Sequence, residues 1–128
     1  MAGVSKGAAG EVLAARFLRE KGYDIFAANY SSRFGEIDLI AAKEPFLAFV
    51  DVKTRSEDAL YTPAQAVTPE KQRRILKTAM LYLQQCPSPF QPRFDVIEVI
   101  TRKGRPLEAV EINHLQGAFE AGELSAAF

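Results

Sequence analysis

The chain has 128 residues, the usual size of one domain, and 48% of them are hydrophobic, so it is long enough to bury a core. Sixteen basic and sixteen acidic side chains cancel, which excludes a net charge that would draw the whole molecule to nucleic acid. The single cysteine, Cys86, excludes an internal disulfide framework, and no apolar run approaches the roughly 18 residues of a membrane span. We therefore expect one cytoplasmic domain over residues 1–128, with no membrane partner.

The first predicted element is a helix over residues 6–22, where apolar side chains recur at helical spacing and Gly22 is a suitable C-terminal cap. Glu11 falls at the edge of the apolar side of this helix. Two interpretations of Glu11 stay open: an ion pair at the helix edge, or an acid that faces a functional site. A strand is predicted over residues 23–30, and residues 31–34 resemble a turn.

Two further strands are predicted over residues 35–42 and 46–55, joined by a short link at residues 43–45. Such a short link permits a hairpin, in which the two strands pair side by side. Residues 56–67 show no clear pattern, and we assign no element to them.

The second half of the chain begins with a clear helix signal. Thr68 can cap free backbone amides, Pro69 suits the first helical position, and Glu70 favours the positive end of a helix that we expect to end at Gln85. Two strands and a short helix are then predicted, over residues 94–101, 107–112 and 115–121. The element order is therefore α-β-β-β-α-β, followed by a less regular tail.

The predicted third strand carries an acid and a base on one face, Asp51 and Lys53, roughly 6–7 Å apart along the strand. They follow an apolar run over residues 46–50, where a charge is costly unless an opposite charge, a metal or a ligand compensates it. Asp-x-Lys alone is most simply an ion pair at the end of a strand. Asp38 adds a carboxylate in the preceding strand, and the hairpin would bring it close to Asp51.

Two neighbouring carboxylates favour a cation between them. Their hard oxygen atoms suit Mg²⁺ or Mn²⁺, which keep several bound waters and hold phosphate oxygens. We therefore predict a divalent-metal site on Asp38 and Asp51. Lys53 would orient or help to deprotonate a water there, or stabilise charge on a phosphate.

Several segments together resemble the YraN-type family of uncharacterised bacterial proteins. They are the helix with Glu11 and the sequences GEIDLI at residues 35–40, FVDVKTR at 49–55, AQAVTPEKQR at 64–73 and RFDV at 93–96. The resemblance extends from about residue 6 to residue 119. This family in turn resembles Holliday-junction resolvases and the wider PD-(D/E)xK nuclease group.

The resemblance implies an α/β domain of the restriction-endonuclease-like (resolvase-like) type, with an αβββαβ core and a mixed central sheet flanked by helices. It implies a Mg²⁺- or Mn²⁺-dependent phosphodiesterase site in which Asp38, Asp51 and Lys53 match the motif of the group. Glu11 matches the helix acid of resolvases, and Asp51 stands where relatives usually have glutamate. Gln65 is a further candidate, since other nucleases of the group use a glutamine. Resolvases act as dimers on branched DNA, so a homodimer is also implied.

Basic side chains are predicted to form a phosphate-binding surface beside this site, the alternative being a solvated helix face. They are Arg33, Arg55, Lys71, Arg73, Arg74 and Lys77. Three functions follow: a metal-dependent endonuclease on branched or damaged DNA, a nucleic-acid-binding protein of nuclease-like fold without turnover, or an interaction protein with a structural ion-pair cluster. His114 is the only histidine, which excludes a histidine-rich zinc site. We expect it at the surface or at a helix cap, and Cys86 packed at a helix end.

Overall fold

Two helices and five strands form the part of the chain that the structure, a computed structural model, describes: residues 6–59 and 67–120. In chain order they are α1 (Lys6–Glu20), β1 (Asp24–Ser32), β2 (Gly35–Lys43), β3 (Phe46–Ser56), α2 (Pro69–Gln85), β4 (Gln91–Arg102) and β5 (Arg105–Phe119). This order confirms the predicted succession α-β-β-β-α-β. No helix among the described residues is long and apolar enough to cross a membrane.

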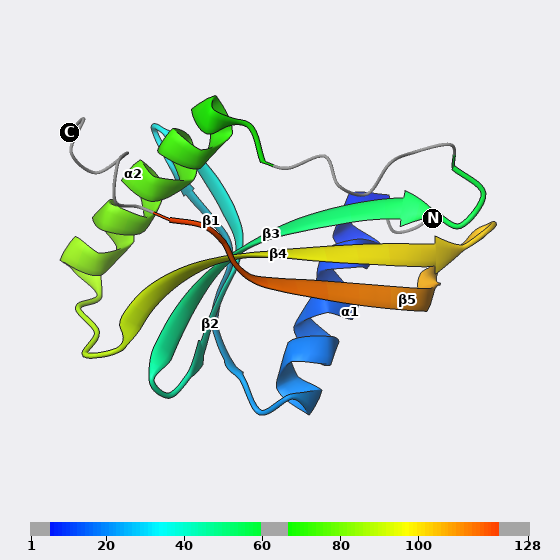
Figure 1. The fold of residues 1–128 in the computed structure, drawn as a ribbon, viewed down its shortest axis with the longest axis horizontal. Helices are drawn as coiled ribbons and strands as arrows, with labels where there is room; N and C mark the ends of the chain where they lie inside the picture. Colours follow the sequence, from blue (N-terminus) through cyan, green and yellow to red (C-terminus); the bar gives the residue numbers. More distant parts are fainter. Residues whose placement is uncertain (1–5, 60–66, 121–128) are drawn as a thin grey trace, which may run out of the picture.

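The strands form one mixed sheet in the order β1-β2-β3-β4-β5 (Figure 1). β1, β2 and β3 are antiparallel neighbours joined by short turns, as expected of strands that lie so close in the sequence. β3 and β4 run parallel, so the chain has to cross over between them, and α2 is the helix of that crossover. β5 returns antiparallel to β4. The predicted α/β class, with a mixed sheet flanked by helices, is therefore confirmed.

The two helices cover opposite faces of the sheet, and the alternation of side chains on β3 explains why (Figure 1). Leu47 and Phe49 pack in the core on the α2 side, where the ring centroid of Phe49 is 6.0 Å from that of Tyr82. Ala48 and Val50 pack in the core on the α1 side. Each large apolar side chain buried in this way stabilises the fold by roughly 1.5–3 kcal/mol.

Gly22 ends α1 in the way that its position in the sequence predicts. Its φ is +93°, a backbone conformation that favours glycine. The amide of Gly22 donates to the Arg19 carbonyl at 3.0 Å, and the amide of Tyr23 donates to the Leu18 carbonyl at 2.9 Å. These two hydrogen bonds satisfy carbonyl groups at the end of the helix and turn the chain into β1.

α1 lies so close to β3 that Gly10 has no room for a side chain. A methyl group on Gly10 would overlap Thr54 Oγ1 and lie 3.0 Å from Thr54 Cβ. We expect Gly10→Ala to lower the free energy of unfolding by about 1–3 kcal/mol, measured by urea denaturation, because α1 would have to shift. Gly7→Ala is the control, since no atom lies within 4 Å of the position of its methyl group. Equal effects of the two substitutions would contradict this packing argument.

The tail of the chain differs from the prediction. A strand over residues 107–112 and a helix from residue 115 are expected, but β5 is one strand that continues to Phe119. The physical reason is pairing with β4: Leu115 lies opposite Val96, and Phe119 lies opposite Phe94, with their ring centroids 5.0 Å apart. These long-range contacts outweigh a weak local preference for helix. Residue 121, where the predicted helix ends, lies outside the described residues.

Candidate functional site

Asp38 lies at a break in the side-chain alternation of β2, although the strand itself is continuous from Gly35 to Lys43. Ile37 packs in the core on the α2 side and Leu39 packs on the α1 side, so the usual alternation of side chains fails between them. Across from this break, Asn29 of β1 has a φ of +53°. The backbone pairing of β2 with β3 ends at Leu39. Beyond that point Asp38 Oδ2 accepts a hydrogen bond from the Val52 amide at 2.7 Å, so the carboxylate takes the place of a backbone carbonyl.

Three carboxylates come together at this break. Glu11 of α1 and Glu36 and Asp38 of β2 each place one oxygen within 4.8 Å of the others. The structure thus brings Glu11, a candidate from the sequence, next to Asp38. Glu36 is not predicted as a site residue from the sequence. It could have been, because Glu36 and Asp38 are two acids separated by one residue at the start of a strand, where alternate side chains share a face.

Asp51 lies on β3 with its side chain 5% exposed and two ammonium groups beside it. Lys53 Nζ is 3.4 Å from Asp51 Oδ2. Lys71 Nζ, from the first turn of α2, is 2.8 Å from Asp51 Oδ1. Among the described residues Oδ2 has no hydrogen-bond partner, so this buried oxygen is compensated by the charge of Lys53.

An open cavity of about 400 Å³ is lined by both aspartates, whereas Glu11 and Lys53 are not among its lining residues. Its walls include Glu36 and Asp38 of β2, Asp51 of β3, and Lys71 and Arg74 of α2. Two aspartates from neighbouring strands therefore line the same cavity, with cations from the crossover helix on its other side.

The environment of Asp38 raises the pKa of its carboxyl group from 3.8 to about 7. Burial is the largest cause, and the negative charges of Asp51 and Glu11 add to it. The hydrogen bond from the Val52 amide and the positive charge of Lys71 act in the opposite direction. A cation bound beside Asp38 would lower this pKa and favour the charged carboxylate.

We expect Asp38→Asn to remove a pH dependence of stability. Folded Asp38 keeps its proton between about pH 4 and 7 while the unfolded chain has lost it, so the free energy of unfolding falls as pH rises through this window. Solvent screening limits the loss to roughly 1–3 kcal/mol. Asparagine cannot ionise. Urea unfolding at pH 5 and pH 8 with a chelator present measures the difference, and equal pH slopes for both proteins would contradict it.

Two of the predicted basic residues line the cavity, and two others lie beside a ring that is next to it in the sequence. Lys71 and Arg74 line it, and Arg74 also forms an ion pair of 2.6 Å with Glu70. The charged groups of Arg33 and Lys77 lie 4.8 and 5.3 Å from the ring centroid of Phe34, which precedes the cavity residue Gly35.

The other two basic residues have different surroundings. Arg55 Nε lies 3.8 Å from the buried carboxylate of Glu98 on β4, and Arg55 is not among the residues that line the cavity. Arg73 is exposed on α2. Gln65 lies outside the described residues. Cys86 is the C-terminal cap residue of α2, at the predicted helix end, but it is exposed rather than packed.

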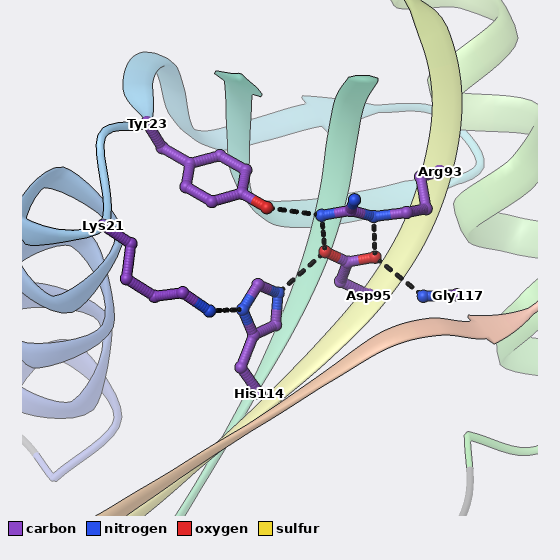
Figure 2. Close-up of polar contacts among 6 residues, drawn as sticks. All are labelled: Lys21, Tyr23, Arg93, Asp95, His114 and Gly117. Carbon is purple, nitrogen blue, oxygen red and sulfur yellow. Dashed lines mark hydrogen bonds and ion pairs between the residues drawn. The ribbon is translucent and has the colours of Figure 1, made fainter. Parts of the chain in front are cut away.

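A second polar cluster is buried near the C-terminal end of α1 (Figure 2). Asp95 of β4 is fully buried and accepts two hydrogen bonds from Arg93, at 2.9 and 2.8 Å, and one from the Gly117 amide at 3.0 Å. His114 Nε2 lies 2.8 Å from the same carboxylate, and Arg93 also donates to Tyr23 Oη at 2.6 Å. The segment between α1 and β1 is thereby held to β4 and β5.

His114 is part of this cluster, so the prediction of a surface or helix-cap position is wrong. Its side chain is only 3% exposed, because the hydrogen bond to Asp95 allows a polar ring to be buried. Lys21 Nζ lies 2.9 Å from Nδ1 of His114. Since an ammonium group only donates, Nδ1 accepts and Nε2 carries the hydrogen that is donated to Asp95.

The fold and this geometry define an α/β protein whose mixed five-stranded sheet carries an acidic cavity flanked by lysines. Residues 10–99 match the family described as "Uncharacterised protein family UPF0102". The chain therefore belongs to that family, which is the YraN-type family that the sequence resembles. The match includes every acid of the cavity.

Three relatives show how far the similarity extends. The UPF0102 protein of Nocardia farcinica is 48% identical over 88% of this chain and 87% of its own length. That of Syntrophomonas wolfei is 41% identical over 86% of this chain and 93% of its own length. UPF0102 protein Cphamn1_0017 of Chlorobium phaeobacteroides is 45% identical over 88% of this chain and 92% of its own length.

Proposed function

We propose that this chain is a divalent-metal-dependent endonuclease that hydrolyses phosphodiester bonds in DNA. The observation that carries the proposal is one cavity lined by Asp38 and Asp51, with Lys53 Nζ 3.4 Å from Asp51. Carboxylates and an ammonium group in this arrangement are suited to bind a divalent cation and a phosphate side by side.

The donor atoms in and beside the cavity fit Mg²⁺ or Mn²⁺. Glu11, Glu36 and Asp38 offer hard oxygen atoms within 4.8 Å of one another, and Asp51, which is not part of that group of three, offers a further carboxylate on the cavity wall. Asp38 and Asp51 would hold the ion, and the two glutamates would bind it directly or through water. When bound, the ion supplies a Lewis acid for the phosphoryl group and lowers the pKa of a bound water.

Lys53 has the chemistry to act on the water or on the phosphate. Hydrolysis forms a bond from the water oxygen to phosphorus and breaks the ester P–O bond, and the leaving alkoxide takes up a proton. The Lys53 ammonium group can donate a hydrogen bond to the phosphate oxygen on which negative charge grows. Its ion pair with Asp51 and its partial burial, 24% exposed, hold it in one place for this role.

Nucleic acid is supported as the substrate by the cations around the cavity. Lys71 and Arg74 line the cavity, and Arg33 and Lys77 lie beside the ring of Phe34, the residue before Gly35 of the cavity wall, although the chain has no net charge. Contacts of this kind bind the phosphate backbone without reading bases, and their affinity falls steeply with salt. The resemblance to resolvases makes branched or damaged DNA, bound by a homodimer, the first substrate class that we propose.

Cleavage assays test the proposal directly. Purified protein is incubated with branched, nicked and linear DNA in Mg²⁺ or Mn²⁺, with a chelator as control. We expect metal-dependent cleavage of at least one substrate. The activity belongs to this chain only if Lys53→Ala removes it, and the absence of such cleavage on all three substrates would overturn the proposal.

One observation favours the second candidate, a nucleic-acid-binding protein without turnover. Both carboxylate oxygens of Asp51 lie beside lysine ammonium groups, and such ion pairs oppose metal binding. Salt-sensitive DNA binding without metal-dependent cleavage would select this function. Absence of both binding and cleavage would leave the ion pairs as a structural cluster.

A further inference from the structure

Lys71 and Asp51 form an ion pair between two parts of the fold that differ in freedom to move. Asp51 is 5% exposed, and its strand is paired with β4 in the middle of the sheet. Lys71 is 46% exposed and reaches Asp51 through a flexible side chain. Its backbone is fixed by the amide, which donates to Thr68 Oγ1 at 3.2 Å in the helix cap. The lysine ammonium group can therefore leave, whereas the carboxylate stays.

Lys71 lines the cavity and Lys53 is not among its lining residues, so a divalent ion that enters the cavity meets the Asp51 oxygen that Lys71 holds, Oδ1. Lys71 Nζ lies 2.8 Å from Asp51 Oδ1, a hydrogen-bonding distance that leaves no space for a second cation on that side. A buried carboxylate without a counter-charge is strongly disfavoured, which gives Lys71 a reason to be there. Lys53 is the less exchangeable partner, because it lies on the same strand as Asp51 and is only 24% exposed.

We infer that Lys71 is an exchangeable counter-ion of Asp51, which a divalent cation must displace in order to bind. The inference rests on the proposed function, since it concerns the same metal site. The displaced ammonium group remains on the cavity wall next to Arg74, where the two cations face an incoming phosphate. Lys71 thereby stabilises Asp51 when the carboxylate has no metal and becomes available to the substrate when it has one.

Measurements of Mn²⁺ affinity by electron paramagnetic resonance test this inference without any substrate. We expect Lys71→Met to bind Mn²⁺ about three- to tenfold more tightly than the wild type, the range expected for removal of one competing ion pair. Lys71→Arg retains the positive charge and should stay within about twofold of the wild type. Lys71 is half-exposed, so the variants are expected to fold, which thermal unfolding checks.

Arg74→Met is the matched control for a general electrostatic effect. Arg74 lines the same cavity, and its removal also leaves a carboxylate unpaired, but that carboxylate is Glu70 instead of Asp51. We expect it to tighten Mn²⁺ binding by less than about twofold. In the Asp51→Asn background, Lys71→Met should have no further effect, because the two residues act through one contact.

The outcomes separate this inference from the proposed function. Wild-type Mn²⁺ binding that Lys71→Met leaves unchanged or weakens overturns the role of Lys71 and leaves the metal site standing. Equal tightening in Lys71→Met and Arg74→Met also overturns it, since local charge then explains both. Absence of Mn²⁺ binding in the wild type and in all variants overturns both the inference and the metal-dependent function.

Discussion

Asp95→Asn is expected to lower the free energy of unfolding by about 3–5 kcal/mol. Asp95 is fully buried and is the only carboxylate drawn in the cluster of Figure 2. Asparagine removes the negative charge and leaves Arg93 without its counter-charge at 13% exposure. Its amide NH₂ group would also face donors from Arg93 or His114. Urea or thermal unfolding at neutral pH measures the loss.

The acid limb of the unfolding curve gives a second measure of the same cluster. Burial alone would raise the pKa of Asp95, but hydrogen bonds from His114, Arg93 and the Gly117 amide hold it below 3.8. The stability that Asp95 contributes is therefore present above about pH 4 and is lost as the pH falls through its folded pKa. Glu108→Gln, in an exposed ion pair, is the control and should leave the unfolding midpoint nearly unchanged. A similar midpoint for both variants would contradict the role of the cluster.

Lys53→Ala is expected to reduce the rate of DNA cleavage by about 10²–10⁴-fold while the protein stays folded. The substitution removes the ammonium group beside the proposed phosphate position and leaves Asp51 Oδ2 without its nearest charge. Because the lost contact strengthens as the phosphate accumulates charge, kcat should fall much more than the affinity for DNA. Single-turnover cleavage at saturating protein, together with a DNA-binding titration, separates the two.

Lys53→Arg is the matched variant for that measurement. It keeps the positive charge but replaces a compact ammonium group with a planar guanidinium group that cannot deprotonate. Partial recovery of cleavage would indicate that Lys53 acts through its charge, and full loss would indicate that it also handles a proton. Cleavage that survives both substitutions would exclude Lys53 from the chemistry.

The parts of the fold that the sequence predicts well are those with strong local signals. α2 has the predicted bounds because Thr68 and Pro69 mark its start and Cys86 precedes a proline that ends it. β5 is predicted less well, since its last residues lack a strand pattern and depend on pairing with β4. Residues at the end of β5 pair with residues of β4 that are distant in the sequence, as Phe119 does with Phe94. The residues immediately around Phe119 therefore do not reveal the pairing.

In the candidate site, too, residues placed by local sequence signals are predicted, and residues placed by long-range contacts are not. Asp38, Asp51 and Lys53 can be found from the sequence because a short hairpin link and the alternation of a strand place them. For Lys71 the sequence predicts only a place in the phosphate-binding surface beside the site, since nothing in it shows that the first turn of α2 returns to β3. The cluster around Asp95 was missed because its partner His114 lies 19 residues away along the chain.

The parallel pairing of β3 with β4 requires a longer stretch of chain to close than the pairing of β1, β2 and β3 does, which favours the hairpins forming first. β1, β2 and β3 are connected by short turns, so they can meet early, whereas β4 has to wait for the long crossover through α2. Asp38 and Asp51 belong to the early hairpin, and Lys71 arrives with the late helix. The hairpin itself carries only one of the two ammonium groups beside Asp51, that of Lys53, so the carboxylates obtain their second positive charge, that of Lys71, only when α2 docks.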